Sequence, residues 1–199
     1  MRLFAALWPT PDVRAHLAHA LRTSVGVDPE TSPGLGPSGI RWIAAECWHL
    51  TLAFYGDVGE GQAAALAEEL GRVSEPPFDL ELRGAGVFAH RTLWAGVGGD
   101  LESVHRLVAA TRAAGESVGI AGDHRVRSRP HVTLGRVREE HGRSRRGRHE
   151  PGPADELVHA LSVYRGPVWP VGSLVLARSE PGAGRAGGPL YSVCAQWPL

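Results

Sequence analysis

The chain has 199 residues, of which 43% are hydrophobic, and its 21 arginines balance 21 acidic side chains without any lysine. This length suits about one to two domains with a buried core, and the apolar content excludes an intrinsically disordered chain. No apolar run reaches the roughly 18 residues of a spanning helix, and Pro9 and Pro11 interrupt the start, which argues against a signal peptide. We therefore expect a cytoplasmic protein that does not bind membranes.

The predicted elements mix short strands with helices along the whole chain. Hydrophobic patterning predicts strands at residues 2–8, 40–43, 48–55, 78–88, 93–97, 131–137, 173–177 and 190–195. It predicts helices that begin at residue 11 and at 60–73, 101–118 and 153–163. The stretch 26–39 is rich in Gly, Pro and Ser and is expected to be a loop. This order indicates one α+β domain over residues 1–199.

The zero net charge hides a concentrated basic segment between Arg125 and Arg148. It holds nine arginines and two acids, a local charge of +7, so the rest of the chain carries −7. We predict a flexible, solvated Arg-rich loop at about residues 139–153. The alternative is that this loop steers RNA towards a nearby site through its phosphates.

The sequence predicts neither a metal site nor a cofactor. Cys47 and Cys194 supply no disulfide framework and no four-ligand zinc pattern, and both are expected to be small buried residues. His16 and His19 could share a helix face, but no carboxylate cluster offers a third ligand. No Gly-rich loop of the kind that cradles phosphates precedes a helix, so ATP is not indicated.

One tetrapeptide is repeated. His49-Leu50-Thr51-Leu52 and His131-Val132-Thr133-Leu134 lie 82 residues apart, each in a predicted strand. Because residues i and i+2 of a strand point to the same side, each His shares a face with its Thr while the apolar residues face a core. Two similar half-domains facing each other would bring two imidazoles and two hydroxyls into one cleft.

These side chains carry the chemistry of phosphodiester cleavage without a metal. Imidazole accepts a proton and imidazolium donates one, and both forms are accessible near the usual pKa of about 6.5. A general acid and a general base each contribute about 10²–10⁴-fold. Threonine hydroxyls can donate hydrogen bonds to an anion held between them. A lone His on a strand is usually a surface or core residue, but the matched pair favours a functional role.

The segments Trp48–Gly56 and Arg129–Arg136, which contain the two tetrapeptides, resemble the two-histidine phosphoesterase superfamily. The chain is most similar to the bacterial RNA 2′,3′-cyclic phosphodiesterases, historically called 2′-5′ RNA ligases, and Arg2–Ala6, Gly84–Phe88 and Gly188–Leu199 share this resemblance. It implies an α+β fold with a bilobal pseudo-twofold duplication. Each lobe then carries an antiparallel sheet with helices on its outer face, and the active cleft lies between the lobes.

The resemblance also implies an activity and its residues. The activity is metal-independent hydrolysis of RNA 2′,3′-cyclic phosphate ends to 2′-phosphomonoesters, which run backwards would be 2′-5′ ligation. His49 would be the proton donor to the leaving 3′ oxygen and His131 the proton acceptor that activates water. Thr51 and Thr133 would hold the non-bridging phosphate oxygens. The substrates would be RNA ends or nucleotide 2′,3′-cyclic phosphates, and we expect a monomer without an obligate protein partner. The sequence alone does not decide which His is acid and which is base.

Two further residues occupy equivalent places, since Phe54 and Arg136 each stand five residues after their His. In the family the aromatic is suited to stacking on a nucleobase and the Arg to binding phosphate. The regular alternation of a strand argues against both roles, because a residue five positions after the histidine points to the opposite face. A bulge at Gly135 could turn Arg136 back, whereas Phe54 could equally be a core residue. Arg41 is a further candidate for the cleft wall.

Two other functions remain open from the sequence. The same site could act on a small cyclic nucleotide or an ADP-ribose cyclic phosphate. The chain could also be a non-catalytic protein that binds RNA or nucleotides, although two intact His and Thr pairs argue against this.

Overall fold

The computed structural model describes residues 1–36, 39–121, 129–137 and 153–199. The strands are β1 (Arg2–Leu7), β2 (Gly34–Leu35), β3 (Ile40–Trp42), β4 (Leu50–Asp57), β5 (Phe78–Phe88), β6 (Thr92–Gly99), β7 (His131–Val137), β8 (Arg165–Val171), β9 (Ser173–Glu180) and β10 (Leu190–Pro198). The helices are α1 (Pro11–Val25), α2 (Glu60–Leu70), α3 (Leu101–Ser117) and α4 (Pro153–Ala160), with 3₁₀ turns η1 (Ala45–Cys47) and η2 (Arg185–Gly187).

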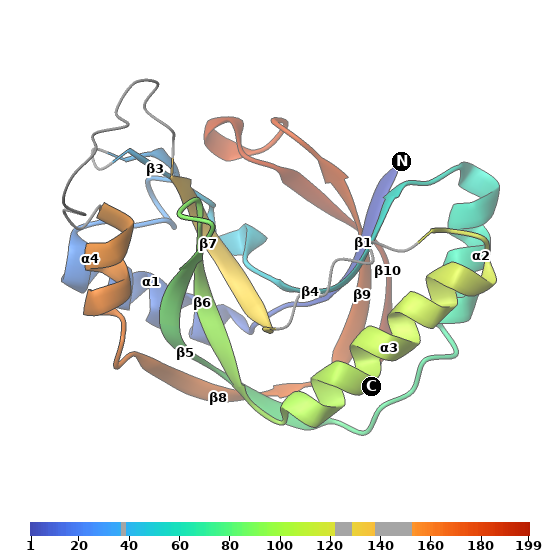
Figure 1. The fold of residues 1–199 in the computed structure, drawn as a ribbon. Coiled ribbons are helices and arrows are strands. Elements are labelled where there is room, and N and C mark those ends of the chain that lie inside the picture. The colour runs from blue at the N-terminus through green and yellow to red at the C-terminus, as the bar shows by residue number, and fades with distance from the viewer. Residues whose placement is uncertain (37–38, 122–128, 138–152) are drawn as a thin grey trace.

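The strands form one curled antiparallel sheet (Figure 1). Its order is β10-β9-β1-β4-β7-β6-β5-β8, and β3 pairs with both β2 and β7. The order divides into two sets of four strands that meet at β4 and β7. We call β10, β9, β1 and β4 the first lobe, and β7, β6, β5 and β8 the second lobe. The expected α+β, two-lobed antiparallel architecture is confirmed.

The helices cover the outer faces of the lobes, and two of them pack on the lobe opposite to the strand that they follow in the chain. Figure 1 shows α2 and α3 beside the first lobe and α1 and α4 beside the second. Helix α3 packs on β4 and α2, where the Tyr55 hydroxyl donates to the Thr111 carbonyl at 2.8 Å. Helix α1 follows β1 in the chain but contacts β8 and α4. Each lobe is therefore covered in part by a helix that follows a strand of the other lobe.

Both faces of β1 are buried, which explains its continuous apolar sequence. Leu3, Ala5 and Leu7 belong to the main core under the helices. Phe4 and Ala6 point to the opposite face, where they form a small inner cluster with Ala177, Trp8, Phe54 and Tyr191. Strand burial on two faces produces an apolar run rather than an alternating pattern.

Several expectations need correction. Strand β8 was not predicted; it contains Pro167 and Pro170 and lies at the sheet edge, where proline is tolerated. The predicted loop 26–39 contains the short strand β2. Cys194 is exposed on edge strand β10, so its predicted burial was wrong, and Cys47 is half-buried.

Residues 139–152 of the predicted Arg-rich loop lie outside the described residues. In the described part of the chain, no helix has both the length and the hydropathy needed to cross a membrane.

Candidate functional site

The two repeated tetrapeptides meet at the centre of the sheet. Strands β4 and β7 pair antiparallel through Leu50 and Val132, the second residue of each tetrapeptide. Extending the register by one residue on each side of this pair sets His49 across from Thr133 and Thr51 across from His131. The cavities agree, since His49 and Thr133 line one space and Thr51 and His131 line another. The fold therefore sets each histidine beside the threonine of the other tetrapeptide, which the sequence spacing alone did not predict.

A β-bulge in the first lobe places Phe54 on the same side of β4 as His49. Strand β1 pairs with Ala53 and then with Thr51 of β4, so Leu52 has no partner in the register. Leu52 and Ala53 are consecutive and both buried, as expected where an extra residue interrupts the pleat. Beyond the bulge the alternation is shifted by one residue. Phe54 consequently lines the same cavity as His49 instead of entering the main core.

The second lobe repeats the same bulge at the equivalent residue. Strand β6 pairs with Gly135 and then with Thr133 of β7, so Leu134 has no partner on β6. A Cβ on Gly135 would lie 3.0 Å from the Arg41 carbonyl oxygen, so the close approach of β3 favours glycine here. Arg136, the next residue, is thereby turned into the same cavity as Thr133.

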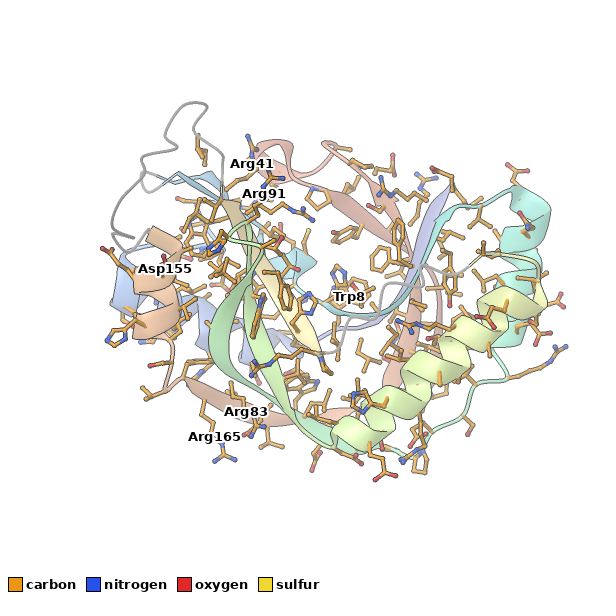
Figure 2. The ribbon with its side chains drawn as sticks, in the orientation of Figure 1. Trp8, Arg41, Arg83, Arg91, Asp155 and Arg165 are labelled. Carbon is orange, nitrogen blue, oxygen red and sulfur yellow. The ribbon has the colours of Figure 1, made fainter. Side chains whose placement is uncertain are left out.

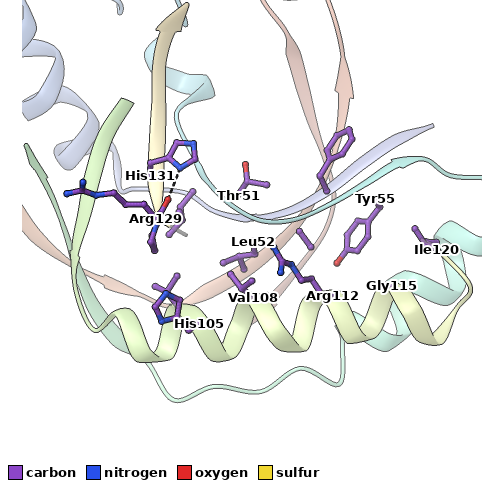
Figure 3. A pocket seen from close by; sticks show the side chains of 15 residues that line it. Thr51, Leu52, Tyr55, His105, Val108, Arg112, Gly115, Ile120, Arg129 and His131 are labelled. Carbon is purple, nitrogen blue, oxygen red and sulfur yellow. Dashed lines mark hydrogen bonds between the residues drawn. The ribbon is translucent and has the colours of Figure 1, made fainter. Parts of the chain in front are cut away.

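Five of the six predicted site residues line one cavity of about 610 Å³, which we call the cleft: His49, Thr51, Phe54, Thr133 and Arg136. The sixth, His131, lines an adjoining side pocket of about 70 Å³ between β4 and α3, together with Thr51, Arg112 and Arg129. Figure 3 shows His131 and Thr51 at the same end of this side pocket. Thr51 and Phe54 line both spaces, so the cleft and the side pocket adjoin at β4.

Three aromatic rings surround the imidazole of His49. Trp8 stacks on it at a centroid distance of 5.0 Å, Phe4 lies at 4.8 Å, and Tyr191 meets it edge-on at 5.0 Å. Figure 2 shows Trp8 between the two lobes. Nδ1 of His49 donates to the Cys47 carbonyl at 2.7 Å. Since a carbonyl oxygen only accepts, the proton sits on Nδ1 and Nε2 is the nitrogen that can exchange a proton with a substrate.

His131 is oriented in the same way. Its Nδ1 donates to the Arg129 carbonyl at 2.9 Å, again two residues earlier, as the dashed line in Figure 3 marks. Phe88 meets the ring edge-on at 4.8 Å and Trp94 at 6.3 Å. The Arg129 guanidinium lies 5.0 Å from the Trp94 ring centroid. Both histidines thus have a fixed tautomer and a ring held by aromatic neighbours, which is how proteins orient imidazoles for proton transfer.

The cleft is cationic. Of the described residues that line it, Arg2, Arg41 and Arg136 are basic and none is acidic. The Arg2 guanidinium lies 5.0 Å from the ring centroid of Phe54 and supports that ring at the cleft wall. Concentrated positive charge around a concave surface attracts an anionic ligand.

The other titratable groups of the cleft stay neutral near pH 7. Burial raises the pKa of the Cys47 thiol to about 11, and burial also raises the pKa of Tyr191 to about 12. The Cys47 thiol donates to the Pro189 carbonyl at 3.5 Å. A thiol held protonated is not a nucleophile, so covalent catalysis by Cys47 is disfavoured. Among the described residues, no three His, Cys, Asp or Glu side chains gather as metal ligands would.

The aromatic residues that orient the histidines were not predicted from the sequence. A signal for Phe4 and Trp8 was present, because they alternate with the core residues of β1 and continue the face that begins at Arg2. For Trp94 and Phe88 the sequence carried no signal. They belong to β6 and β5, and they contact His131 only because the sheet order places these strands near β7.

Comparison with known proteins gives a consistent result. Residues 30–97 match the family model described as LigT-like phosphoesterase. The chain is 30% identical over 144 residues to an RNA 2′,3′-cyclic phosphodiesterase of Archaeoglobus fulgidus, covering 70% of this chain and 74% of that protein. It is also 30% identical over 134 residues to an RNA 2′,3′-cyclic phosphodiesterase of Escherichia coli, covering 67% and 70%. Its fold is similar to E. coli LigT complexed with NADP⁺, with a TM-score of 0.70, 25% identity and coverage of 100% and 96%.

Proposed function

The chain belongs to the LigT-like phosphoesterase family, and we propose that it hydrolyses the 2′,3′-cyclic phosphate at RNA 3′ ends to a 2′-phosphomonoester without a metal. The paired arrangement of the tetrapeptides at Leu50 and Val132 carries this proposal. It provides two tautomer-fixed imidazoles and two hydroxyls around a cationic cleft. The names of the A. fulgidus and E. coli relatives support the choice of substrate.

Each half of the reaction uses one histidine. His131 accepts a proton from a water molecule through Nε2 as the water oxygen attacks phosphorus. The bond between phosphorus and the 3′ oxygen breaks, and His49 donates a proton from Nε2 to that oxygen. The products are a 2′-phosphate and a free 3′ hydroxyl, with one proton gained by His131 and one lost by His49. Exchange with solvent restores both rings, because imidazole titrates near neutral pH.

The remaining residues bind and orient the substrate. The Thr51 and Thr133 hydroxyls donate to the non-bridging phosphate oxygens, where negative charge builds up during attack. Phe54 stacks on the terminal nucleobase, and Arg136 supplies a guanidinium to a phosphate group of the substrate. Their positions on the same cleft as His49 support these roles.

The test uses an oligoribonucleotide that ends in a 2′,3′-cyclic phosphate, with a chelator present throughout. Wild type, His49→Ala and His131→Ala are compared, and the product end is mapped as a 2′ or a 3′ phosphate. We expect a 2′-phosphate from wild type and a loss of activity in both variants. Activity that disappears with the chelator would contradict the metal-free mechanism. Tight binding without turnover would instead favour an RNA-binding protein.

The cellular setting is part of the same proposal. RNA ends in the cytoplasm would be the substrate, and a monomer would suffice, because the described part of one chain supplies both histidines. Size-exclusion chromatography with light scattering tests the monomer directly.

A further inference from the structure

Two arginines stand directly opposite each other in the cleft wall. Strand β3 pairs with β7 so that Arg41 faces Arg136, and both side chains are exposed to the cleft. Residues opposite each other in an antiparallel pair have Cβ atoms about 4.5–5.5 Å apart, and like charges there are destabilising. Within the described residues, neither guanidinium pairs with a carboxylate. Such a pair of arginines becomes favourable when an anion lies between the two guanidinium groups.

The guanidinium groups of Arg41 and Arg136 do not lie at the reacting phosphate itself. Arg136 follows Thr133 by three residues on β7, which is at most about 10 Å along a strand. Thr133 lies across from His49, at the centre where the tetrapeptides meet. The arginines therefore lie beyond that centre, on the side of the second lobe. A substrate whose cyclic phosphate sits at the centre would reach them with its next phosphate.

We propose that Arg41 and Arg136 together bind the phosphodiester on the 5′ side of the terminal nucleoside. This inference rests on the proposed function and narrows its substrate to oligonucleotide ends, in preference to free mononucleotide cyclic phosphates. A guanidinium presents donors in a planar fork, so two opposed forks can engage the non-bridging oxygens of one phosphodiester.

Arg41 is positioned before any substrate arrives. Its Nη1 donates to the Ala186 carbonyl at 3.0 Å, which uses one of its five N–H donors. Ala186 lies in η2, within the connection from β9 to β10 that extends from the first lobe towards β2 and β3 (Figure 1). Figure 2 shows Arg41 at this end of the molecule. Holding the side chain in place lowers the entropic cost of binding the phosphate.

The same connection offers a matched control. Arg185 also fastens it, through Glu46 at 3.1 Å and the Glu30 carbonyl at 2.9 Å, but Arg185 does not line the cleft. Arg41→Gln removes a cleft cation and a fastening bond, whereas Arg185→Gln removes only the fastening. A purely structural role of Arg41 would make the two variants behave alike.

The experiment measures kcat/KM for adenosine 2′,3′-cyclic phosphate and for the dinucleotide ApA ending in the same cyclic phosphate. We expect wild type to prefer the dinucleotide and Arg41→Gln to reduce this preference about ten- to hundredfold, the size of a lost charged hydrogen bond. Arg185→Gln should keep the preference. The dependence of dinucleotide kcat/KM on salt should become shallower in Arg41→Gln, because one phosphate contact is lost. Circular dichroism checks that each variant is folded.

Different outcomes overturn different claims. Equal kcat/KM values for the two substrates in wild type would overturn the two-arginine site while leaving the proposed function intact. The same loss of preference in Arg185→Gln would also overturn it, in favour of a fastening role. Failure of wild type to hydrolyse either substrate would refute the proposed function, and this inference with it.

Discussion

Gly86→Ala should lower the catalytic rate by displacing Trp94, which contacts His131. Gly86 of β5 pairs with Trp94 of β6, and the indole lies across the glycine. A Cβ at this position would lie 2.2 Å from Cζ2 of Trp94, whereas carbon atoms normally approach to about 3.5 Å. The ring would have to retreat by about 1.3 Å, and at 5% exposure it is surrounded by other side chains.

A displaced Trp94 moves the wall that orients His131. Trp94 stacks on Phe88 at 4.9 Å, and both rings contact the imidazole. A misplacement of about 1 Å at a reacting group can cost about 100-fold in rate. Overpacking itself costs about 1–3 kcal/mol of stability, which the fold can tolerate. We therefore expect a folded protein with a kcat about 10- to 100-fold lower on the cyclic phosphate.

The assay compares kcat and thermal midpoint for wild type, Gly86→Ala and Gly172→Ala. Gly172 is the control, since a Cβ there meets no atom within 4 Å and its φ is not positive. Replacing Trp94 with Phe in the Gly86→Ala background should restore part of the activity, because the smaller ring makes room. An unchanged kcat in a stably folded Gly86→Ala would refute the view that Trp94 holds His131 in place.

Four further outcomes are expected. Phe54→Ala should weaken substrate binding by about 1–3 kcal/mol through lost base stacking, and an unchanged KM would count against that role. The pH profile of kcat/KM should be bell-shaped between about pH 5 and 8, because one motif histidine must be protonated and the other neutral, and a flat profile would contradict paired acid–base catalysis. Iodoacetamide at pH 8 should modify exposed Cys194 before Cys47, whose pKa burial raises to about 11, with activity retained until Cys47 reacts, as peptide mass mapping can follow. Hydrogen bonds from Arg106 lower the pKa of Glu75, so this carboxylate stabilises the fold above its unfolded pKa of about 4.3 and the stabilisation is lost as pH falls through the lowered value. Glu75→Gln should accordingly lower the thermal midpoint at pH 7 and leave it nearly unchanged in strong acid; the same loss at both pH values would contradict the ion pair.

Patterning predicts the elements whose signal is local. Strands β5 and β7 begin and end where the alternation of apolar residues predicts, and the helices lie within a few residues of their predicted ends. Strand β8 escapes prediction because tolerance of Pro167 and Pro170 depends on a place at the sheet edge, which the segment itself does not encode.

The period of a single strand does not place Phe54 and Arg136 in the cleft, and only the family resemblance predicted them there. Regular alternation places each on the face opposite its histidine. The bulges at Leu52 and Leu134 reverse this, and they are decided by the partner strands β1 and β6. A sequence pattern within one strand describes its own period, whereas a bulge is a property of two strands together. The aromatic contacts of His131 depend on sheet order in the same way.

The two lobes repeat a backbone and differ in the side chains that it presents. The bulge stands at the fourth residue of each tetrapeptide, and each histidine donates to the carbonyl two residues before it. The motif residues therefore do not distinguish the two sides of the site, since each side presents one His and one Thr. The two sides of the site differ in the side chain that each strand presents beyond its bulge, an aromatic ring at Phe54 and a guanidinium at Arg136, which are suited to different parts of a nucleotide. Under the proposed function, the division of labour between acid and base is thus set by Phe54 and Arg136, because they fix which lobe receives the nucleobase.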